Sequence, residues 1–274
     1  MRETAHPVLR FDRVGKRFPD GTVALAGVDL SVASGEFVSV VGPSGCGKST
    51  VLRIASGLTA ASGGEAVVHT DKLGYVFQDP TLLPWRTVQA NVELLAELDG
   101  LPKGERRRRA NEAIRLVGLS DFARHRPRTL SGGMRMRVSL ARSLTLQPEL
   151  FLFDEPFGAL DEITRERLND ELLQLFLSQR FTALFVTHSV TEAVFVSTRV
   201  VVMSGRPGQV IGDFDALTAP PARKFMDTLF PIHTGEVGGL VGRLGIVVIG
   251  AWLVTMIVFG VSLWWSRRRP RMGA

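Results

Sequence analysis

The 274-residue sequence predicts an α/β fold built around a mainly parallel β-sheet. Three observations support this prediction. Short, continuously apolar segments alternate with helical segments, one apolar segment leads into a glycine-rich loop, and another ends in two adjacent acids. Continuous apolar segments are typical of parallel strands that are covered on both faces.

The expected strands of this sheet are apolar and end at polar residues or turns. They are residues 36–41, 150–153, 183–187 and 199–203. Two further apolar segments, 23–25 and 28–32, predict an antiparallel β layer near the N-terminus.

Helical segments surround and interrupt these strands. A helix is expected at 49–56, where Gly57 ends it. Between about residues 87 and 146 the sequence predicts a helical insertion within the α/β core. Its expected helices are 88–98, 105–117 and 132–146, with turn signals at 100–102 and Gly118.

Composition narrows the possible classes of protein. Cys46 is the only cysteine, so neither an internal disulfide nor a Cys/His zinc site is expected. Residues 1–10 lack the apolar stretch of a signal peptide. The net charge is +6, but residues 240–274 hold five arginines and no acids, which argues against a nucleic-acid-binding surface. The basic run at 106–109 fits either a solvated helix face or contact with an acidic partner or membrane headgroups.

The segment 42–49 reads Gly-Pro-Ser-Gly-Cys-Gly-Lys-Ser and matches G-x-x-x-x-G-K-[ST] between an expected strand and helix. In such a loop, backbone N–H groups approach phosphates, Lys48 neutralises the β- and γ-phosphate oxygens, and the Ser49 hydroxyl ligates Mg²⁺. We expect Cys46 to be a small residue that fits this loop rather than a reactive thiol. The predicted ATP-binding residues here are Gly42, Pro43, Ser44, Gly45, Cys46, Gly47, Lys48, Ser49 and Thr50.

Asp154 and Glu155 end an apolar strand that we expect beside the loop-bearing strand. The first acid suits Mg²⁺, directly or through water, and the second suits polarising the water that attacks the γ-phosphate. An acidic pair can instead cap a following helix, but Pro156 begins a turn there.

Three further residues are candidates for the ATP site, although each can instead have an ordinary structural role. His188, at the end of the next strand, can hydrogen-bond the γ-phosphate and hold the catalytic water and Glu155. Gln78, at the junction with the helical insertion, can contact Mg²⁺ or water. Phe18 can stack on adenine or simply pack in the core.

The segment 130–134, Leu-Ser-Gly-Gly-Met, opens an expected helix and supplies a second set of backbone N–H donors for anions. Because one phosphate-binding loop is already present, this second set predicts contact with ATP that is held by another copy of the protein. We therefore expect Ser131, Gly132 and Gly133 to bind ATP in trans.

Taken together, these segments resemble the ATP-binding-cassette (ABC) ATPase family over roughly residues 8–230. The matching motifs are the Walker A loop at 42–49, the Walker B strand at 151–155, the signature at 130–134, the Q-loop at Gln78, the H-loop at His188, the D-loop at 158–161 and the adenine-stacking aromatic at Phe18. The chain departs from the usual pattern with Phe at 18 and Met at 134 and 136.

Finer similarity points to the nitrate/sulfonate/taurine-type importer ATPases. It is carried by residues 77–85, 130–135, 154–161 and 203–208, although importers of pyrimidine precursors share much of it. The resemblance implies an ATP hydrolase that drives uptake of a small solute, with ATP and Mg²⁺ as cofactors. The alternatives are an importer of another solute, a membrane-tethered regulatory ATPase, or an ABC ATPase that acts on macromolecules. The last usually has a long coiled-coil insertion or two cassettes in one chain.

The resemblance also implies partners and location. They are a head-to-tail homodimer of ATPase subunits, two permease subunits, an extracytoplasmic substrate-binding protein and the inner (plasma) membrane, with the ATPase domain on its cytoplasmic side. In this reading residues 1–230 form the ATPase domain, with the helical subdomain at about 87–146.

The remainder of the chain does not fit a typical importer cassette. A linker is expected at 231–243, followed by 244–265, which contain no charged residue, and a basic tail at 266–274. At ~1.5 Å per residue, 244–265 give ~33 Å of helix, enough to cross a bilayer core of about 30 Å. Arginines follow the span, so the positive-inside tendency would place the tail in the cytoplasm. The ATPase domain is also expected there, and a single crossing cannot leave both ends on the same side of the membrane. Three hypotheses stay open: a single span with its arginines outside, the first span of a fused permease, or a membrane-associated or re-entrant helix.

Overall fold

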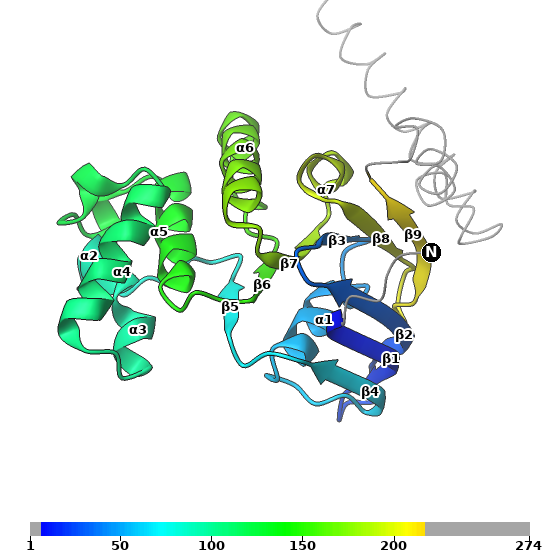
Figure 1. The fold of residues 1–274 in the computed structure, drawn as a ribbon. Helices are drawn as coiled ribbons and strands as arrows, with labels where there is room; N and C mark the ends of the chain where they lie inside the picture. Colours follow the sequence, from blue (N-terminus) through cyan, green and yellow to red (C-terminus); the bar gives the residue numbers. More distant parts are fainter. Residues whose placement is uncertain (1–6, 217–274) are drawn as a thin grey trace, which may run out of the picture. The chain divides into compact units, whose positions relative to one another are not determined.

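The structure is a computed structural model that describes residues 7–216 (Figure 1). The predicted linker at 231–243, the hydrophobic segment 244–265 and the basic tail at 266–274 lie outside these residues. Within residues 7–216, no helix is both long and apolar enough to cross a membrane.

The central sheet contains six strands in the order β5-β6-β7-β3-β8-β9. All its neighbouring strands pair in parallel except β8 and β9, which are antiparallel. The strands are β3 (Phe37–Val41), β5 (Leu73–Val76), β6 (Leu150–Asp154), β7 (Thr182–Thr187), β8 (Arg199–Met203) and β9 (Val210–Asp215). The predicted parallel sheet is therefore confirmed. The expectation that the strand bearing Asp154 lies beside the loop-bearing strand is wrong, because β7 lies between β6 and β3.

Both faces of this sheet are covered, as the continuous apolar segments predict. On one face, Val38 and Val40 pack with Leu52 of α1 (Lys48–Ala55). On the other face, Phe37 packs with Phe185 and with the helix α6 (Glu162–Gln179). A short helix, α7 (Val190–Val196), follows β7 on this second face. Alternate residues of one strand thus belong to two different hydrophobic clusters.

The N-terminal antiparallel layer is confirmed, but the two predicted segments 23–25 and 28–32 belong to a single strand of it. It contains β1 (Pro7–Arg17), β2 (Val23–Ala33) and β4 (Gly63–Val68) in the order β2-β1-β4. In β2, Val28, Leu30 and Val32 are buried while Asp29 and Ser31 are exposed. This alternation directs one face of the layer toward α1.

The helical insertion contains α2 (Val88–Val92), α3 (Leu94–Leu98), α4 (Lys103–Leu116) and α5 (Gly132–Leu144). The predicted helical segment 88–98 is confirmed, but it is divided into two helices at Glu93. The Arg86 guanidinium donates to the Ala90 carbonyl at 3.4 Å, which is the acceptor that an unbroken helix would offer to Leu94.

A buried asparagine shapes the loop that enters this insertion. Asn91 Nδ2 donates to the carbonyls of Leu83, Arg86 and Thr87, and its Oδ1 accepts from Leu83 N. All four bonds are to backbone atoms. The exposed Trp85 lies within the loop that they hold.

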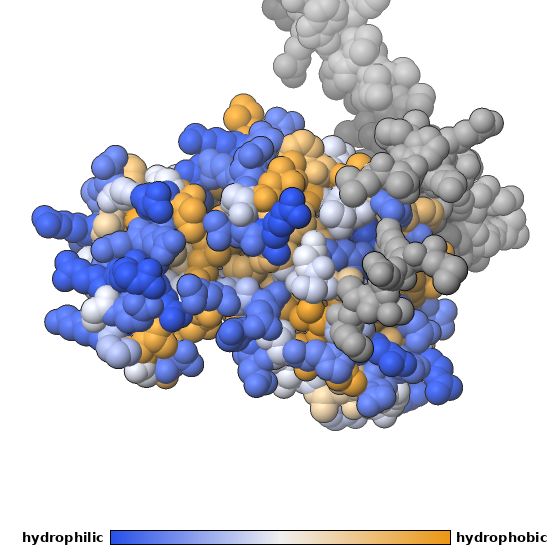
Figure 2. All heavy atoms as spheres, in the orientation of Figure 1, coloured by the Kyte–Doolittle hydropathy of each residue, from blue (hydrophilic) through white to orange (hydrophobic). Residues whose placement is uncertain are grey.

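The surface of the insertion is largely hydrophilic on the face shown in Figure 2. On α4, Glu105 pairs with Arg108 and Arg109, and their hydrogen bonds lower the pKa of its carboxyl to about 2. Arg106 lies 3.8 Å from Glu93. These ion pairs within the chain favour the interpretation of the basic run as a solvated helix face.

Candidate functional site

The phosphate-binding loop connects β3 to α1 and depends on two glycines. Gly47 has φ +106°, and a Cβ there would lie 2.8 Å from the Ala24 carbonyl oxygen. A Cβ on Gly42 would lie 2.8 Å from the Met203 carbonyl oxygen. Both positions therefore require a residue without a side chain. Cys46 is buried, and burial raises the pKa of its thiol, which favours a packing residue over a reactive one.

Lys48 begins α1, and its ammonium group lies across the loop. The side chain is 4% exposed, and Nζ donates to the carbonyls of Gly42 at 2.8 Å and Pro43 at 3.0 Å. Glu155 Oε1 lies 3.8 Å from the same nitrogen. A buried cation is thus held at the position where the sequence predicts phosphate binding.

Ser49 and Asp154, the predicted metal ligands, are in direct contact. Ser49 Oγ donates to Asp154 Oδ1 at 2.7 Å. A hydroxyl and a carboxylate are the hard oxygen donors that Mg²⁺ prefers, usually completed by water and substrate phosphates. This donor set fits that ion. Within residues 7–216, no three His, Cys, Asp or Glu side chains gather to form a metal site from protein ligands alone.

Glu155 lies between a cation and a histidine. Its Oε2 is 3.0 Å from His188 Nδ1, and since an ionised carboxylate only accepts, this hydrogen bond requires a proton on Nδ1. The backbone of Glu155 has φ +44°, an uncommon conformation for a residue with a side chain. The turn that holds it includes bonds from Glu155 N to Val186 O and from Gly158 N to Glu155 O. Backbone strain of this kind is typical of functional sites.

Gln78 and Phe18 are placed less directly. A Cβ on Gly158 would lie 3.5 Å from Gln78 Nε2 and 3.6 Å from Glu155 Oε2, so both side chains border the same glycine. Phe18 is half-buried in the turn after β1, with Lys16 Nζ 5.4 Å from its ring centroid. Adenine stacking on Phe18 and Mg²⁺ contact by Gln78 stay predictions.

The signature segment begins α5 with a side-chain cap. Ser131 Oγ accepts from Met134 N at 3.2 Å, and Ser131 itself is exposed. A Cβ on Gly133 would lie 2.9 Å from Thr164 Cγ2 on α6, so this glycine also allows α5 and α6 to approach closely. The roles of Ser131, Gly132 and Gly133 as ATP contacts in trans stay a prediction.

Three residues of the site were not predicted from the sequence. Tyr75 Oη donates to Asp154 Oδ2 at 3.3 Å, and burial together with Asp154 raises the pKa of the phenol, which keeps it a donor. Arg142, on the buried face of α5, donates to the carbonyls of Pro80 and Thr81 just after Gln78. Glu192 lies buried near His188. A charged residue among apolar helix positions is the sequence signal that could have found the last two.

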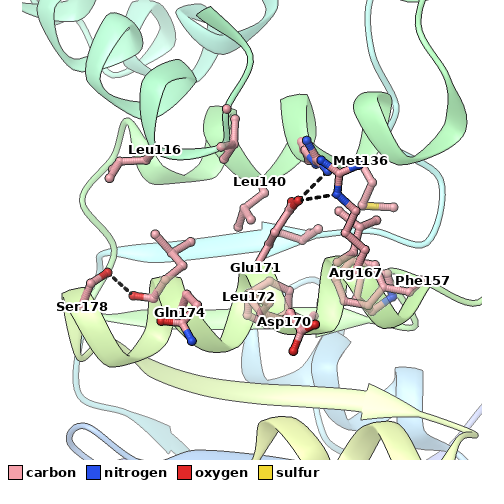
Figure 3. Close-up of a pocket in the computed structure, with 18 residues that line it drawn as sticks. Leu116, Met136, Leu140, Phe157, Arg167, Asp170, Glu171, Leu172, Gln174 and Ser178 are labelled. Carbon is pink, nitrogen blue, oxygen red and sulfur yellow. Dashed lines mark hydrogen bonds and ion pairs between the residues drawn. The ribbon is translucent and has the colours of Figure 1, made fainter. Parts of the chain in front are cut away.

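A separate cavity of about 620 Å³ lies between α5 and α6 (Figure 3). Leu140 and Leu172 line it from opposite sides, and Glu171 pairs at its edge with Arg137 at 2.6 Å and Arg167 at 3.2 Å. The lining includes none of the predicted ATP or metal residues.

Comparison with known proteins agrees with this geometry. The family model of the ABC transporter matches residues 25–158. The aliphatic sulfonates import ATP-binding protein SsuB 1 of Mesorhizobium japonicum is 43% identical over 220 residues, covering 78% of this chain and 81% of that protein. The nitrate import ATP-binding protein NrtD of Synechococcus elongatus is 42% identical over 217 residues, covering 75% and 79% respectively.

A solved structure of similar fold adds a second line of comparison. MJ0796, a bacterial ABC transporter cassette, has a TM-score of 0.67 and 34% identity, covering 76% of this chain and 98% of that one. It was solved as a dimer and in a dimeric post-hydrolysis state bound to ADP and Pi.

These findings define the chain as a nucleotide-hydrolysing cassette. It belongs to the ABC transporter family, as an ATPase subunit of importer type.

Proposed function

We propose that this protein powers the import of a small anion, such as a sulfonate, taurine or nitrate, by hydrolysing ATP as a head-to-tail homodimer. The observation that carries the catalytic part is the placement of Glu155 between Lys48 Nζ and His188 Nδ1. The anion class is supported by the sulfonate and nitrate importer ATPases among its relatives. An importer of another solute is the alternative.

In this mechanism, Lys48 neutralises charge on the β- and γ-phosphates, and Glu155 accepts a proton from the attacking water. His188 holds the Glu155 carboxylate through Nδ1. Ser49 and Asp154 would hold Mg²⁺, with Gln78 as a further contact, and that ion neutralises charge between the β- and γ-phosphates when bound. The γ-phosphate of ATP bound to one subunit would also accept hydrogen bonds from the backbone N–H groups of Ser131 to Gly133 of a second subunit.

The partners that we propose are two permease subunits, an extracytoplasmic substrate-binding protein and the cytoplasmic face of the inner membrane. The exposed Trp85, 68% accessible in the loop after Gln78, supports this surface as the contact with a permease.

The Glu155→Gln substitution tests the assignment of Glu155 as the catalytic base. A glutamine keeps the size of the side chain but cannot accept the proton, so we expect turnover to fall by about 100-fold or more while ATP accumulates in a stable dimer. Steady-state hydrolysis and size-exclusion chromatography with ATP measure both effects. Glu65→Gln, an exposed residue on β4, serves as the matched control. Unchanged hydrolysis in Glu155→Gln would remove Glu155 as the base.

For residues 244–265 we propose membrane attachment, with a single span as the leading version and the fused-permease and re-entrant versions as alternatives. Arg271→Cys introduces a thiol beyond the span, while the native Cys46 is buried. Labelling of the Arg271→Cys variant by a membrane-impermeant maleimide on intact cells supports the single span with its tail outside. The unsubstituted chain, which keeps only the buried Cys46 thiol, is the control. Protection of the variant from the reagent would refute that version.

A further inference from the structure

Glu192 is a buried acid next to the histidine of the site. It is 5% exposed and occupies the third position of α7, whose N-cap is Ser189. His188 therefore lies between the last residue of β7, Thr187, and the first capping residue of α7.

Both neighbours of His188 are bonded to Glu192, Thr187 through the carboxyl and Ser189 through the backbone N–H. The Thr187 hydroxyl donates to Glu192 Oε2. Ser189 N donates to Thr187 Oγ1 at 3.0 Å, and Glu192 N donates to Ser189 Oγ at 3.3 Å. The result resembles a capping box in which the Thr187 hydroxyl is inserted between the glutamate and the N-cap N–H.

The Thr187 hydroxyl makes two hydrogen bonds. It accepts from Ser189 N, because a backbone N–H can only donate, and its own proton is directed to Glu192 Oε2. Thr187 is itself immobilised, because it pairs with Val41 of β3 immediately before the phosphate-binding loop. Glu192 thus ties the turn that carries His188 to the central sheet.

The second oxygen of the Glu192 carboxyl is less well satisfied than the first. Glu192 Oε1 and Asn169 Oδ1 on α6 are buried and have no hydrogen-bond partner within the part of the chain that the structure describes. Burial raises the pKa of Glu192, while Thr187, Arg165, Asn169 and His188 act in the opposite direction. A buried carboxyl that is only partly satisfied is costly, so the bond from Thr187 matters for keeping Glu192 in place.

We propose that Glu192 is a positioning residue that keeps His188 against Glu155. Its carboxyl holds the hydroxyl of Thr187, which in turn accepts from the backbone N–H of Ser189 on the other side of His188. The expected effect on hydrolysis rests on the proposed role of His188. The position of the His188 ring, in contrast, can be measured whether or not His188 has that role.

The test compares three variants of the full-length chain. Glu192→Ala removes the carboxyl, Thr187→Val removes only the bridging hydroxyl, and Glu192→Gln keeps an oxygen that accepts from Thr187. Glu166→Ala, an exposed acid on α6, is the matched control. Nitrogen NMR of selectively labelled histidines reports on His188, one of five histidines, with its signal assigned from its loss in His188→Gln.

We expect Glu192→Ala and Thr187→Val to shift the ring-nitrogen signals of His188, and Glu192→Gln and Glu166→Ala to leave them in place. The first two variants should lower kcat by about 10- to 100-fold, whereas Glu192→Gln and Glu166→Ala should keep kcat near the unsubstituted value. In all four variants KM for ATP should change by less than about twofold. Thr187→Val decides the test if Glu192→Ala does not fold.

Unshifted His188 signals in folded Glu192→Ala or Thr187→Val would overturn the proposal. Shifted signals with unchanged kcat would uphold the positioning and instead refute the catalytic role proposed for His188. Loss of activity in Glu192→Gln equal to that in Glu192→Ala, without a shift of His188, would also overturn it.

Discussion

Two helices of this protein begin at segments predicted to face phosphate, and they begin differently. At the start of α1, Gly47 has a left-handed backbone and offers no side-chain cap, and the following Lys48 is buried among carbonyls of its own loop. At the start of α5, Ser131 caps the helix with its own hydroxyl and is exposed.

The start of α1 is a site that one chain organises by itself. The start of α5, by contrast, is a surface that is stable without a ligand. The α1 loop is shaped by contacts with Ala24, Leu25 and Met203 of the same chain. The α5 start needs none of these, because its capping bond is local. This contrast supports the proposal that α5 meets ATP bound to another subunit.

The largest effect is expected when the start of α1 is inactivated in one chain and the start of α5 in another. Neither Lys48→Ala nor Ser131→Arg alone should hydrolyse ATP, because each homodimer lacks the same half of both sites. A mixture should recover part of the activity, since a mixed dimer has one intact site. Steady-state hydrolysis across mixing ratios measures this, with each variant mixed with itself as the control. An inactive mixture would contradict shared sites.

A smaller effect is expected from adding a methyl group at each start. Gly47→Ala should lower the free energy of unfolding by about 3 kcal/mol, because the new Cβ meets backbone and the conformation is left-handed. Gly133→Ala should cost about 1 kcal/mol, since its closest new contact is the Thr164 methyl group. Urea denaturation compares the two.

Gly35→Ala is the control for the cost that a left-handed backbone conformation alone imposes on an alanine. Gly35 has φ +73°, and its added Cβ would meet nothing within 4 Å among residues 7–216. A cost for Gly35→Ala equal to that for Gly47→Ala would show that the close contacts at Gly47 contribute little.

The smallest effect is expected from Ser131→Ala, which removes the capping hydroxyl. The loss should be about 1 kcal/mol in the free energy of unfolding. Ser56→Ala, at the C-terminal end of α1, is the matched control, because its hydroxyl donates to the Arg53 carbonyl instead of capping a helix start. Equal losses in the two variants would mean that the cap at α5 is not special.

The sequence predicts those parts of the candidate site whose residues lie close together in the chain. The loop 42–49 and the acids at 154 and 155 follow from short patterns, because phosphate and metal binding require those residue types at fixed spacing. The parallel sheet was predictable from apolar segments for the same local reason.

The order of the strands was not predictable in this way. β7 separates β6 from β3, yet Ser49 still reaches Asp154 at 2.7 Å, because parallel strands end at one edge of the sheet. Tyr75 contacts Asp154, a partner far away in the chain that spacing does not reveal. The break at Glu93 coincides with a hydrogen bond from Arg86, a side chain outside both helices, to the Ala90 carbonyl.

Asn91 has a consequence for how this protein can diverge. Since it holds the loop of residues 83–87 through main-chain atoms, its bonds do not depend on the side chain displayed at Trp85. Trp85 can therefore be exchanged for another residue without rebuilding the backbone beneath it. Loop shape and surface chemistry are encoded at separate positions, which lets one change over generations while the other is kept.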